Sequence, residues 1–586
     1  MRVFASVLLG IGLAAVPLVA NDAKDAGKEA ASATTAAEKP KEAAKPENAV
    51  IESELQDLRS LVQSQMQELE AQRATLKAQE LKMEVLEEKL HSSPSGPVNL
   101  AVAEPAVSSV ATPSAAIGAA PRTLSASVAT PAQGGTEEKP SPLYFKIGAA
   151  EFYPLGFMDM MGVYRTTNLG GIGTSFGSIA FNNTVPTGRL SEFRFSTQNS
   201  RIGLRTHAKF GEADVTGYLE ADFLGYLPPN GEITSNSNSL RTRLYWVNYR
   251  RGKIEFLGGQ SWSFLTPNRT GLGALPGDLF YSQDVDTNYQ LGLTWARQTS
   301  FRVILHPTNN WAIGVSIENP QQTLPGSVVL PTGVSAGYAT SNNLPQLDTN
   351  SGNTSNAVAA NNINVPNLHP DVIVKTAFDF KPGGHQVHFD FAGLFRSFRV
   401  VNLLATSSAA NTNRDTIHGG GAAATANIEL VKNFRVIATG FYSYAGGRYI
   451  ASTGGPDVIV RADGNLSGVH SGSAIGGFEY QPNPKTVIYG YYSGAYFNKN
   501  TGLAGTGTVP NIGYGNPASA SSSANRFIYE PTFGIHYTMW RNPNYGDLRL
   551  MTQYSYVSRT PWVVATGAPR TAHTSMVYID LRYDLP

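Results

Sequence analysis

The sequence predicts an all-β fold, a transmembrane antiparallel β-barrel of about 16 strands, preceded by an α-helical coiled coil. Three observations lead to this fold class. Polar and apolar side chains alternate with a period of two from Leu143 to Pro586. The connections between these segments are short and long in turn. A heptad repeat precedes the alternating region.

The composition suits a wall with one face in lipid and one in water. Of 586 residues, 41% are hydrophobic and only 15% are charged, whereas soluble proteins carry about a quarter charged residues. The net charge of +1 argues against a surface that binds nucleic acid. The chain has no cysteine, so it can form no disulfide and no thiolate metal site.

Residues 1–20 are expected to be a signal peptide, with Arg2 ahead of an apolar region from Val3 to Val16, and Ala20 as a small residue suited to cleavage. A short membrane anchor is the alternative, but the run is too short to span a bilayer comfortably. No later segment offers about 20 consecutive apolar residues. An exported chain that is also membranous would then cross the bilayer as a closed barrel.

Residues 21–49 are rich in Ala, Lys and Glu and are predicted to be disordered, and the Pro-, Ser- and Ala-rich residues 92–142 are predicted to be a linker. Between them, residues 50–91 carry the heptads of a coiled coil, although a single amphipathic helix is the alternative. Three glutamines at d would weaken the coil but could fix its register. The residues expected at the oligomer interface are Leu55, Leu58, Val62, Gln65, Leu69, Gln72, Leu76, Gln79, Met83 and Leu86.

Residues 143–586 are predicted to form the barrel. The segment around Ile202 and the segment around Leu219 each alternate, and four residues, 211–214, separate them, as in a hairpin. Short turns recur near 250–253, 307–310, 382–385, 431–433, 482–485 and 542–546, and long connections include 264–288, 319–369 and 400–415. A soluble sandwich or propeller would not explain this alternation in loop length, and a barrel of this size leaves a water-filled channel.

Several motifs resemble those of the DcaP-like outer-membrane porins. They are SRIGLRT (200–206), LEADF (219–223), LRTRLYWVNY (240–249), GQSWSF (259–264) and ENP (318–320). The resemblance implies a homotrimeric channel for small, often anionic, solutes in the outer membrane of a Gram-negative bacterium, with the coiled coil in the periplasm. It also implies that the loop after the fifth strand, Leu265 to Asn288, folds into the pore. The candidates in this constriction loop are Arg269, Asp278, Asp284 and Asp286.

Basic residues fall on the faces predicted to line the lumen. They are Arg201, Arg205, His207, Lys209, Arg241, Arg243, Lys375 and Arg396. Ladders of Arg and Lys favour anions in a pore. The alternative is a structural ladder in which Glu220 and Asp222 pair with the arginines across the wall.

The function predicted from the sequence is that of an outer-membrane porin in contact with lipid, which lets small hydrophilic solutes diffuse passively with a mild anion preference. The alternative is a structural protein that tethers the membrane to peptidoglycan through its N-terminal region. A trimeric adhesin is disfavoured, because each chain has enough strands to close its own barrel. No catalytic or metal-binding motif is found, so no enzyme activity, metal or cofactor is expected, and nucleic acid is not an expected partner.

Overall fold

The computed structural model describes the barrel region with gaps. The described residues are 143–169, 175–184, 187–225, 235–274, 279–284, 289–320, 334–336, 368–404, 412–461, 463, 465–503, 506–518 and 523–586. The predicted signal peptide, disordered segment, coiled coil and linker all lie outside them, and so do Asp278 and Asp286.

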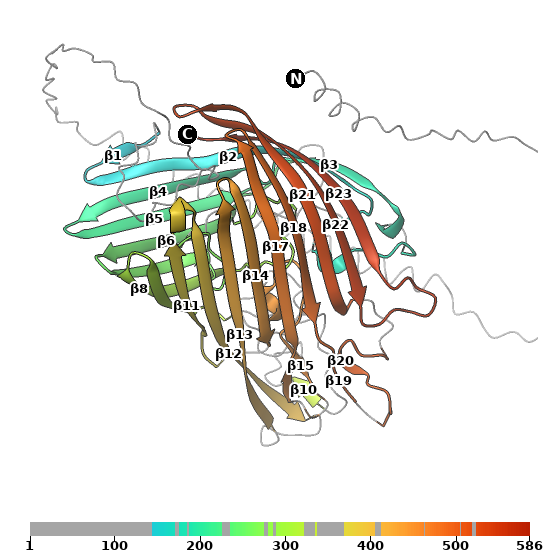
Figure 1. Ribbon diagram of the computed structural model, residues 1–586. Coiled ribbons are helices and arrows are strands. Elements are labelled where there is room, and N and C mark those ends of the chain that lie inside the picture. The colour runs from blue at the N-terminus through green and yellow to red at the C-terminus, as the bar shows by residue number, and fades with distance from the viewer. Residues whose placement is uncertain are drawn as a thin grey trace, which may run out of the picture. The chain divides into compact units, whose positions relative to one another are not determined.

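The described residues form one large antiparallel sheet with short additions (Figure 1). Its strands are β1 (Phe145–Ile147), β2 (Ala150–Arg165), β3 (Glu192–Ser196), β4 (Arg201–Phe210), β5 (Ala213–Asp222), β6 (Arg241–Arg251), β7 (Ile254–Trp262), β8 (Arg297–Thr308), β9 (Trp311–Glu318), β10 (Val334–Ala336), β11 (Asp371–Phe380), β12 (Val387–Leu404), β13 (Thr412–Val431), β14 (Phe434–Tyr444), β17 (His470–Asn483), β18 (Thr486–Phe497), β21 (Asn525–Asn542), β22 (Gly546–Pro561) and β23 (Ala572–Asp584). Two small hairpins, β15 (Val458–Val460) with β16 (Leu466–Gly468) and β19 (Asn500–Gly502) with β20 (Ile512–Tyr514), lie in the long loops. The described helices are short 3-10 turns, η1 (Phe176–Ser178), η2 (Thr187–Arg189), η4 (Pro382–Gly384) and η5 (Gly447–Tyr449), and none is long and apolar enough to cross a membrane.

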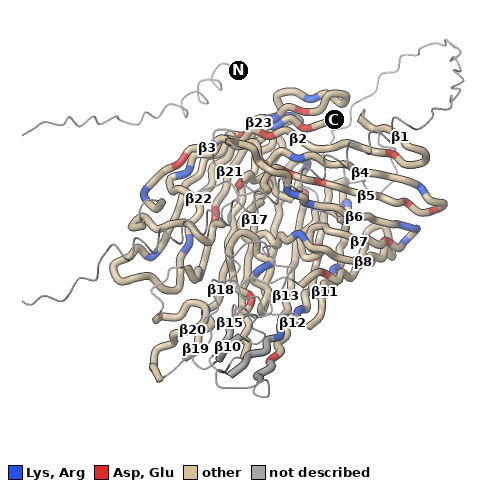
Figure 2. Tube along the Cα trace, turned by 180° about the vertical axis from the view of Figure 1, so that it is seen from behind, with Lys and Arg blue, Asp and Glu red and all other residues tan. Residues whose placement is uncertain are grey.

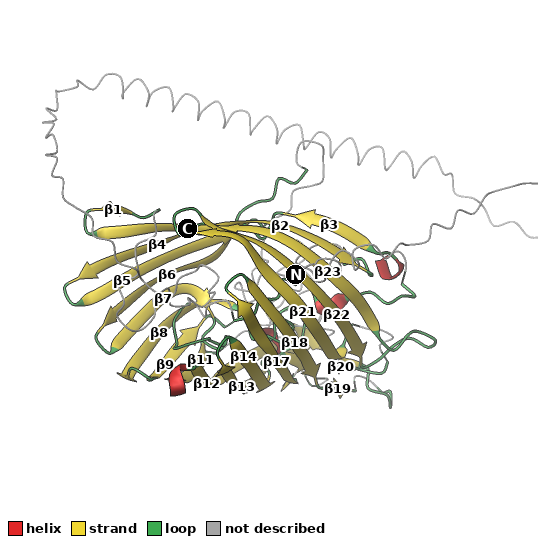
Figure 3. Cartoon of the chain, turned by 45° about the horizontal axis from the view of Figure 1, so that its top comes forward, coloured by secondary structure: helices red, strands yellow, loops and turns green. Residues whose placement is uncertain are grey.

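The large sheet closes into a barrel of sixteen strands, which confirms the predicted barrel (Figure 3). The last strand, β23, pairs with β2 along Phe157–Arg165, which seals the wall. The segments β3 and β4 both pair with β2, at different heights, and act as one wall strand. Short β1 and β10 pair beside longer neighbours and add no further wall strand.

The connections alternate in length as the sequence predicts. At one end the strands join through residues 211–212, 252–253, 309–310, 381–386, 432–433, 484–485 and 543–545. Gly211 and Gly546 adopt positive φ angles of 62° and 89°, which these tight turns require. The long connections lie at the other end. The predicted loop 400–415 is wrong in its bounds, because β12 and β13 continue their ladder as far as Leu403 and Thr412.

Outward and inward residues alternate along each strand. On β2, Met158 is 60% exposed and Met160 49%, whereas Asp159 between them is 3% exposed. Ile202 on β4 and Val247 on β6 follow the outward pattern. The outer face therefore presents apolar side chains to lipid, and the polar side chains point into the barrel.

Candidate functional site

The described residues of the long connection from β7 to β8, which are 263–274, 279–284 and 289–296, fold into the barrel. Its described residues are nearly all buried, including Leu265, Phe280 and Tyr289. It follows the fifth wall strand, as the resemblance implied for the constriction loop. We call residues 263–296 the inward loop, and its contacts define the candidate site.

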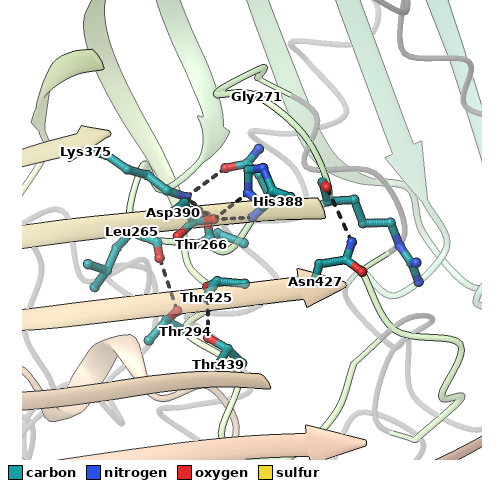
Figure 4. Close-up of polar contacts among 12 residues, drawn as sticks. Leu265, Thr266, Gly271, Thr294, Lys375, His388, Asp390, Thr425, Asn427 and Thr439 are labelled. Atoms are coloured by element: carbon teal, nitrogen blue, oxygen red, sulfur yellow. Dashed lines mark hydrogen bonds and ion pairs between the residues drawn. The ribbon is translucent and has the colours of Figure 1, made fainter. Parts of the chain in front are cut away.

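The first part of the inward loop is attached to β11 and β12 (Figure 4). The Lys375 Nζ donates to the Thr266 carbonyl and to the Asn268 Oδ1, both at 2.7 Å. The Asn268 backbone N–H donates to Asp390 at 3.0 Å, and His388 also bonds to Asp390. These buried polar groups satisfy one another, so they fix the loop against the wall.

The middle of the inward loop is held by a buried ion pair. Both terminal nitrogens of Arg269 donate to the Glu479 carboxylate on β17, at 2.9 and 2.7 Å. Asn427 on β13 donates to the Arg269 carbonyl at 3.3 Å (Figure 4). Burial lowers the pKa of Arg269, but the Glu479 carboxylate outweighs burial, so the net shift of that pKa is upward. The guanidinium therefore stays charged.

Beyond Arg269 the loop packs on an apolar part of the wall. Leu279, Phe280, Tyr281 and Leu293 form a buried cluster with wall side chains of β14, β17 and β18, which are Ile437, Ile475, Val487, Tyr489 and Tyr491. The Tyr491 hydroxyl also accepts the backbone N–H of Tyr281 at 3.1 Å. Burial of these rings and aliphatic chains stabilises the loop position.

The last part of the loop meets a carboxyl pair. Asp284 and Glu530 on β21 are hydrogen-bonded to each other, and each keeps one buried oxygen without a further partner. Glu530 also accepts from the Leu291 backbone N–H at 3.1 Å and from Gln290 at 2.9 Å. Burial raises the pKa of Asp284. Two contacting carboxyl groups resist ionising together, so this contact requires a proton.

Two further loops pack against the inward loop near the long-loop end. Phe176 and Ile179, from the connection of β2 to β3, cluster with Tyr289. Ile450, from the connection of β14 to β17, forms an isolated β-bridge with Thr294. The inward loop is thereby braced from the wall and from the neighbouring loops.

A cluster of charges lies on β4, β5 and β6, where residues of both signs follow the strands (Figure 2). Arg243 donates to Glu220 and to Asp222, both at 2.7 Å. Arg241 donates twice to Asp222, at 2.9 and 2.6 Å, and Arg201 lies 4.0 Å from Glu220. The side chain of Arg241 is 29% exposed, whereas Arg243 is fully buried. Much of this predicted anion-attracting set is therefore ion-paired inside the wall.

The other predicted lumen bases fall into two groups. Arg205 lies over the Tyr153 ring at 4.7 Å, His207 lies 3.3 Å from Asp214, and Lys209 is exposed near the β4–β5 turn. Lys375 and Arg396 are fully buried, and Arg396 pairs with two carboxylates, Asp371 at 3.2 Å and Asp457 at 3.0 Å. The first group keeps contact with water, while the second fastens loops to the wall.

Several residues that hold the inward loop were not among the predicted site residues. Three wall side chains accept backbone N–H groups of the loop. Glu530 on β21 accepts from Leu291, Gln553 on β22 accepts from Gln283, and Glu318 on β9 accepts from Phe264. The period-two pattern places Glu530 on the inward face and could have identified it. The loop residue that Glu530 contacts depends on the path of the inward loop, and the period-two pattern of the strands does not predict that path. Among the described residues, no group of three or more His, Asp or Glu side chains is placed to hold a metal.

The closed wall and inward loop define an outer-membrane channel fold. No family model matches the chain, and no curated protein matches it. Among solved structures, the outer membrane channel DcaP of Acinetobacter baumannii aligns with a TM-score of 0.52 at 16% identity, over 75% of this chain and 99% of that channel. The anion-selective porin from Comamonas acidovorans aligns over 74% of this chain and all of its own, with a TM-score of 0.39 at 10% identity. The motifs in the sequence predicted a DcaP-like barrel, and the similarity to the DcaP structure confirms that fold.

Proposed function

We propose that the chain is an outer-membrane porin through which small hydrophilic solutes diffuse passively. The observation that carries this proposal is a loop held inside a sixteen-strand barrel by contacts with the wall. Barrels of this size are too wide to be filled by their own wall side chains and leave an aqueous channel. A fixed loop then sets the size limit for solutes.

A mild anion preference is part of the proposal. Three guanidinium groups, of Arg201, Arg241 and Arg243, face two carboxylates, of Glu220 and Asp222, so the cluster carries one net positive charge. Exposed Lys209 and partly exposed Arg205 add positive charge that water and solutes reach. Positive groups along a pore raise the local concentration of anions.

The trimer and the periplasmic coiled coil are also proposed. The heptads of residues 50–91 would join three chains, and the Lys- and Ala-rich residues 21–49 would extend into the periplasm. The same two segments support the second candidate function, a tether to peptidoglycan. Deletion of residues 21–91 separates the two functions: a porin keeps its conductance per barrel, whereas a tether loses co-sedimentation with peptidoglycan.

Single-channel recording in planar bilayers tests the porin function. Purified protein should give stepwise increases in conductance. Under a salt gradient, the sign of the reversal potential should indicate that anions permeate more readily than cations. A folded barrel, judged by its faster gel migration before boiling, that inserts without conducting would rule out the porin function. A reversal potential on the cation side would refute the anion preference alone.

A further inference from the structure

The outer face of the barrel carries a hollow on strands β12 to β21, on the lipid side rather than in the lumen. Its volume is about 1190 Å³. Outward positions on other strands carry bulky side chains such as Leu219, Phe301 and Ile317. A second, smaller hollow lies beside Met158, Met160 and Leu581 on another side of the barrel.

The floor of the hollow is made of small outward residues that lie side by side on four adjacent strands. Ala424 on β13 pairs with Gly440 on β14, Gly440 with Ala474 on β17, and Ala474 with Gly494 on β18. With strands about 4.8 Å apart, this row is about 15 Å long. A parallel row of Ala426, Ala438 and Gly476 doubles its width.

Aromatic rings close the hollow on its sides. Phe389 and Phe391 on β12 flank one end of the rows, and Tyr492 on β18 and Phe527 on β21 lie at the other. Tyr442 stands at the rim nearest the long loops, and its hydroxyl hydrogen-bonds to His470 Nδ1 at 3.1 Å. The result is a dry trough with aromatic walls, which fits a narrow hydrocarbon chain.

Basic residues lie beyond the rim at the long-loop end. His470 precedes Gly472 on the same face of β17, Lys499 follows β18 and is exposed, and Arg526 lies over the Trp562 ring at 4.9 Å. From Gly464 to Tyr529 the sequence has one acidic residue, Glu479, which is buried against Arg269 inside the barrel. The exposed charges that β17, β18 and β21 contribute at this rim are therefore positive, which suits an anionic headgroup.

On β17, β18 and β21 the trough ends closer to these basic residues than to the short turns, whereas on β12 Phe389 lies two residues from the start of the strand at a short turn. On β18, Tyr496 at the rim is three residues from Lys499, whereas Tyr492 is six residues from the turn that begins the strand. Long loops face the cell exterior in outer-membrane barrels, so the part of the trough on β17, β18 and β21 lies at the height of the outer leaflet. That leaflet is built of phosphorylated glycolipids with several acyl chains.

We propose that this trough binds an acyl chain of a phosphorylated outer-leaflet glycolipid, with its phosphate held by His470, Lys499 and Arg526. The proposal rests on the outer-membrane location but not on conduction. A bound acyl chain would account for the Gly and Ala residues at these outward positions of β13, β14, β17 and β18.

Native mass spectrometry of the full chain in detergent tests the proposal, with diphosphorylated lipid A as the probe. Filling the trough with Ala438→Leu and Gly476→Leu should lower retained glycolipid about tenfold, because the acyl chain loses its contact area. A Cβ at Gly476 meets nothing within 4 Å, so the fold tolerates the change. Gly258→Leu, outward on β7 with its nearest neighbour at 3.9 Å, is the matched control and should bind as the wild type does.

The headgroup is tested separately by replacing His470, Lys499 and Arg526 with Gln. Retention should fall about fivefold for each Lys or Arg removed, and the preference over a dephosphorylated glycolipid should disappear. Lys432→Gln with Lys485→Gln, at the short turns, should change neither. Unchanged retention in the filled variant, or equal retention of phosphatidylglycerol by the wild type, would overturn the proposal. A changed oligomeric mass in the filled variant would also overturn it, by making the trough a contact between copies.

Conductance distinguishes failure of this proposal from failure of the proposed function. The trough variants change the outside of the wall, so they should conduct as the wild type does. A wild-type barrel that retains glycolipid without conducting would contradict the porin function and leave the lipid site standing.

Discussion

Two parts of the lumen wall, about half a turn of the barrel apart, are built in different ways. On β4 to β6 the inward face carries ion pairs, with Arg243 between Glu220 and Asp222. On β14 to β18 it carries apolar side chains such as Ile437 and Ile475, onto which the inward loop packs. The wall at β4 to β6 therefore buries paired charges, whereas the wall at β14 to β18 holds the loop that narrows the lumen.

The difference shows that an inward-facing base is not by itself a selectivity residue. Arg243, Lys375 and Arg396 are fully buried with polar or acidic partners, so their charge is largely neutralised inside the wall. Arg205 and Lys209 retain contact with water. We therefore assign a structural role to the first group and propose a selective role for the second.

The largest expected effect is on stability, from Arg243→Met. Removing one partner of a buried ion pair leaves uncompensated buried carboxylates and costs about 3–5 kcal/mol. The variant should unfold at a clearly lower temperature in detergent, measured by the loss of fast gel migration. Arg251→Met is the control, because its partner Glu212 and the arginine itself are both mostly exposed. Equal unfolding temperatures for the two variants would refute the structural role of Arg243.

The second prediction concerns the wall at β14 to β18, where Glu479 on β17 forms an ion pair with Arg269 of the inward loop. Arg269→Gln removes two hydrogen bonds to Glu479 and leaves that carboxylate buried without its cation. The loop should move off the wall, which changes the single-channel conductance and increases current noise. The double variant with Glu479→Gln should be less perturbed than the sum of the single variants, because both groups act in one pair. Wild-type currents in the Arg269 variant would show that the loop is held in place without this ion pair, by its apolar packing and its other polar contacts.

A third, smaller effect follows from the carboxyl pair of Asp284 and Glu530. The titratable groups around Asp284 are Glu530, Arg165, Tyr289, Tyr489 and Tyr578. Because burial raises the pKa of Asp284, the folded loop favours the protonated carboxyl, and the loop contact should weaken as pH rises above about 4, the usual range of a free aspartate. Current noise should therefore grow with pH. Glu530→Gln should flatten this dependence, and an equally steep dependence in that variant would locate the titration elsewhere.

The fold was largely predictable, because period two and loop length are local properties. The alternation around Ile202 and Leu219, and the turn after Phe210, follow from the sequence alone. The split of one wall strand into β3 and β4, and the extension of β12 to Leu404, were not predictable. Both depend on pairing with a neighbouring strand rather than on the residues of the segment.

The site was predictable in part for the same reason. Alternation gives the face of Arg201 or Arg243, and the motif resemblance gave the inward loop. Burial and partners depend on which strands and loops meet, so the sequence could not separate Arg205, beside Tyr153, from Arg396, enclosed by Asp371 and Asp457. The outward trough was also not predicted, because its small residues join one row through strand register alone.

The most direct test is the reversal potential of the double variant Arg205→Gln with Lys209→Gln. It shows whether the exposed basic residues select anions while the buried ones only stabilise the fold. We expect a shift toward cation preference in a barrel that still folds and conducts, since neither residue closes a fully buried ion pair. Lys381→Gln with Lys432→Gln removes the same charge at other short turns and should leave the reversal potential unchanged. A reversal potential equal to that of the wild type in the first variant, or an equal shift in both variants, would contradict a selective role for Arg205 and Lys209.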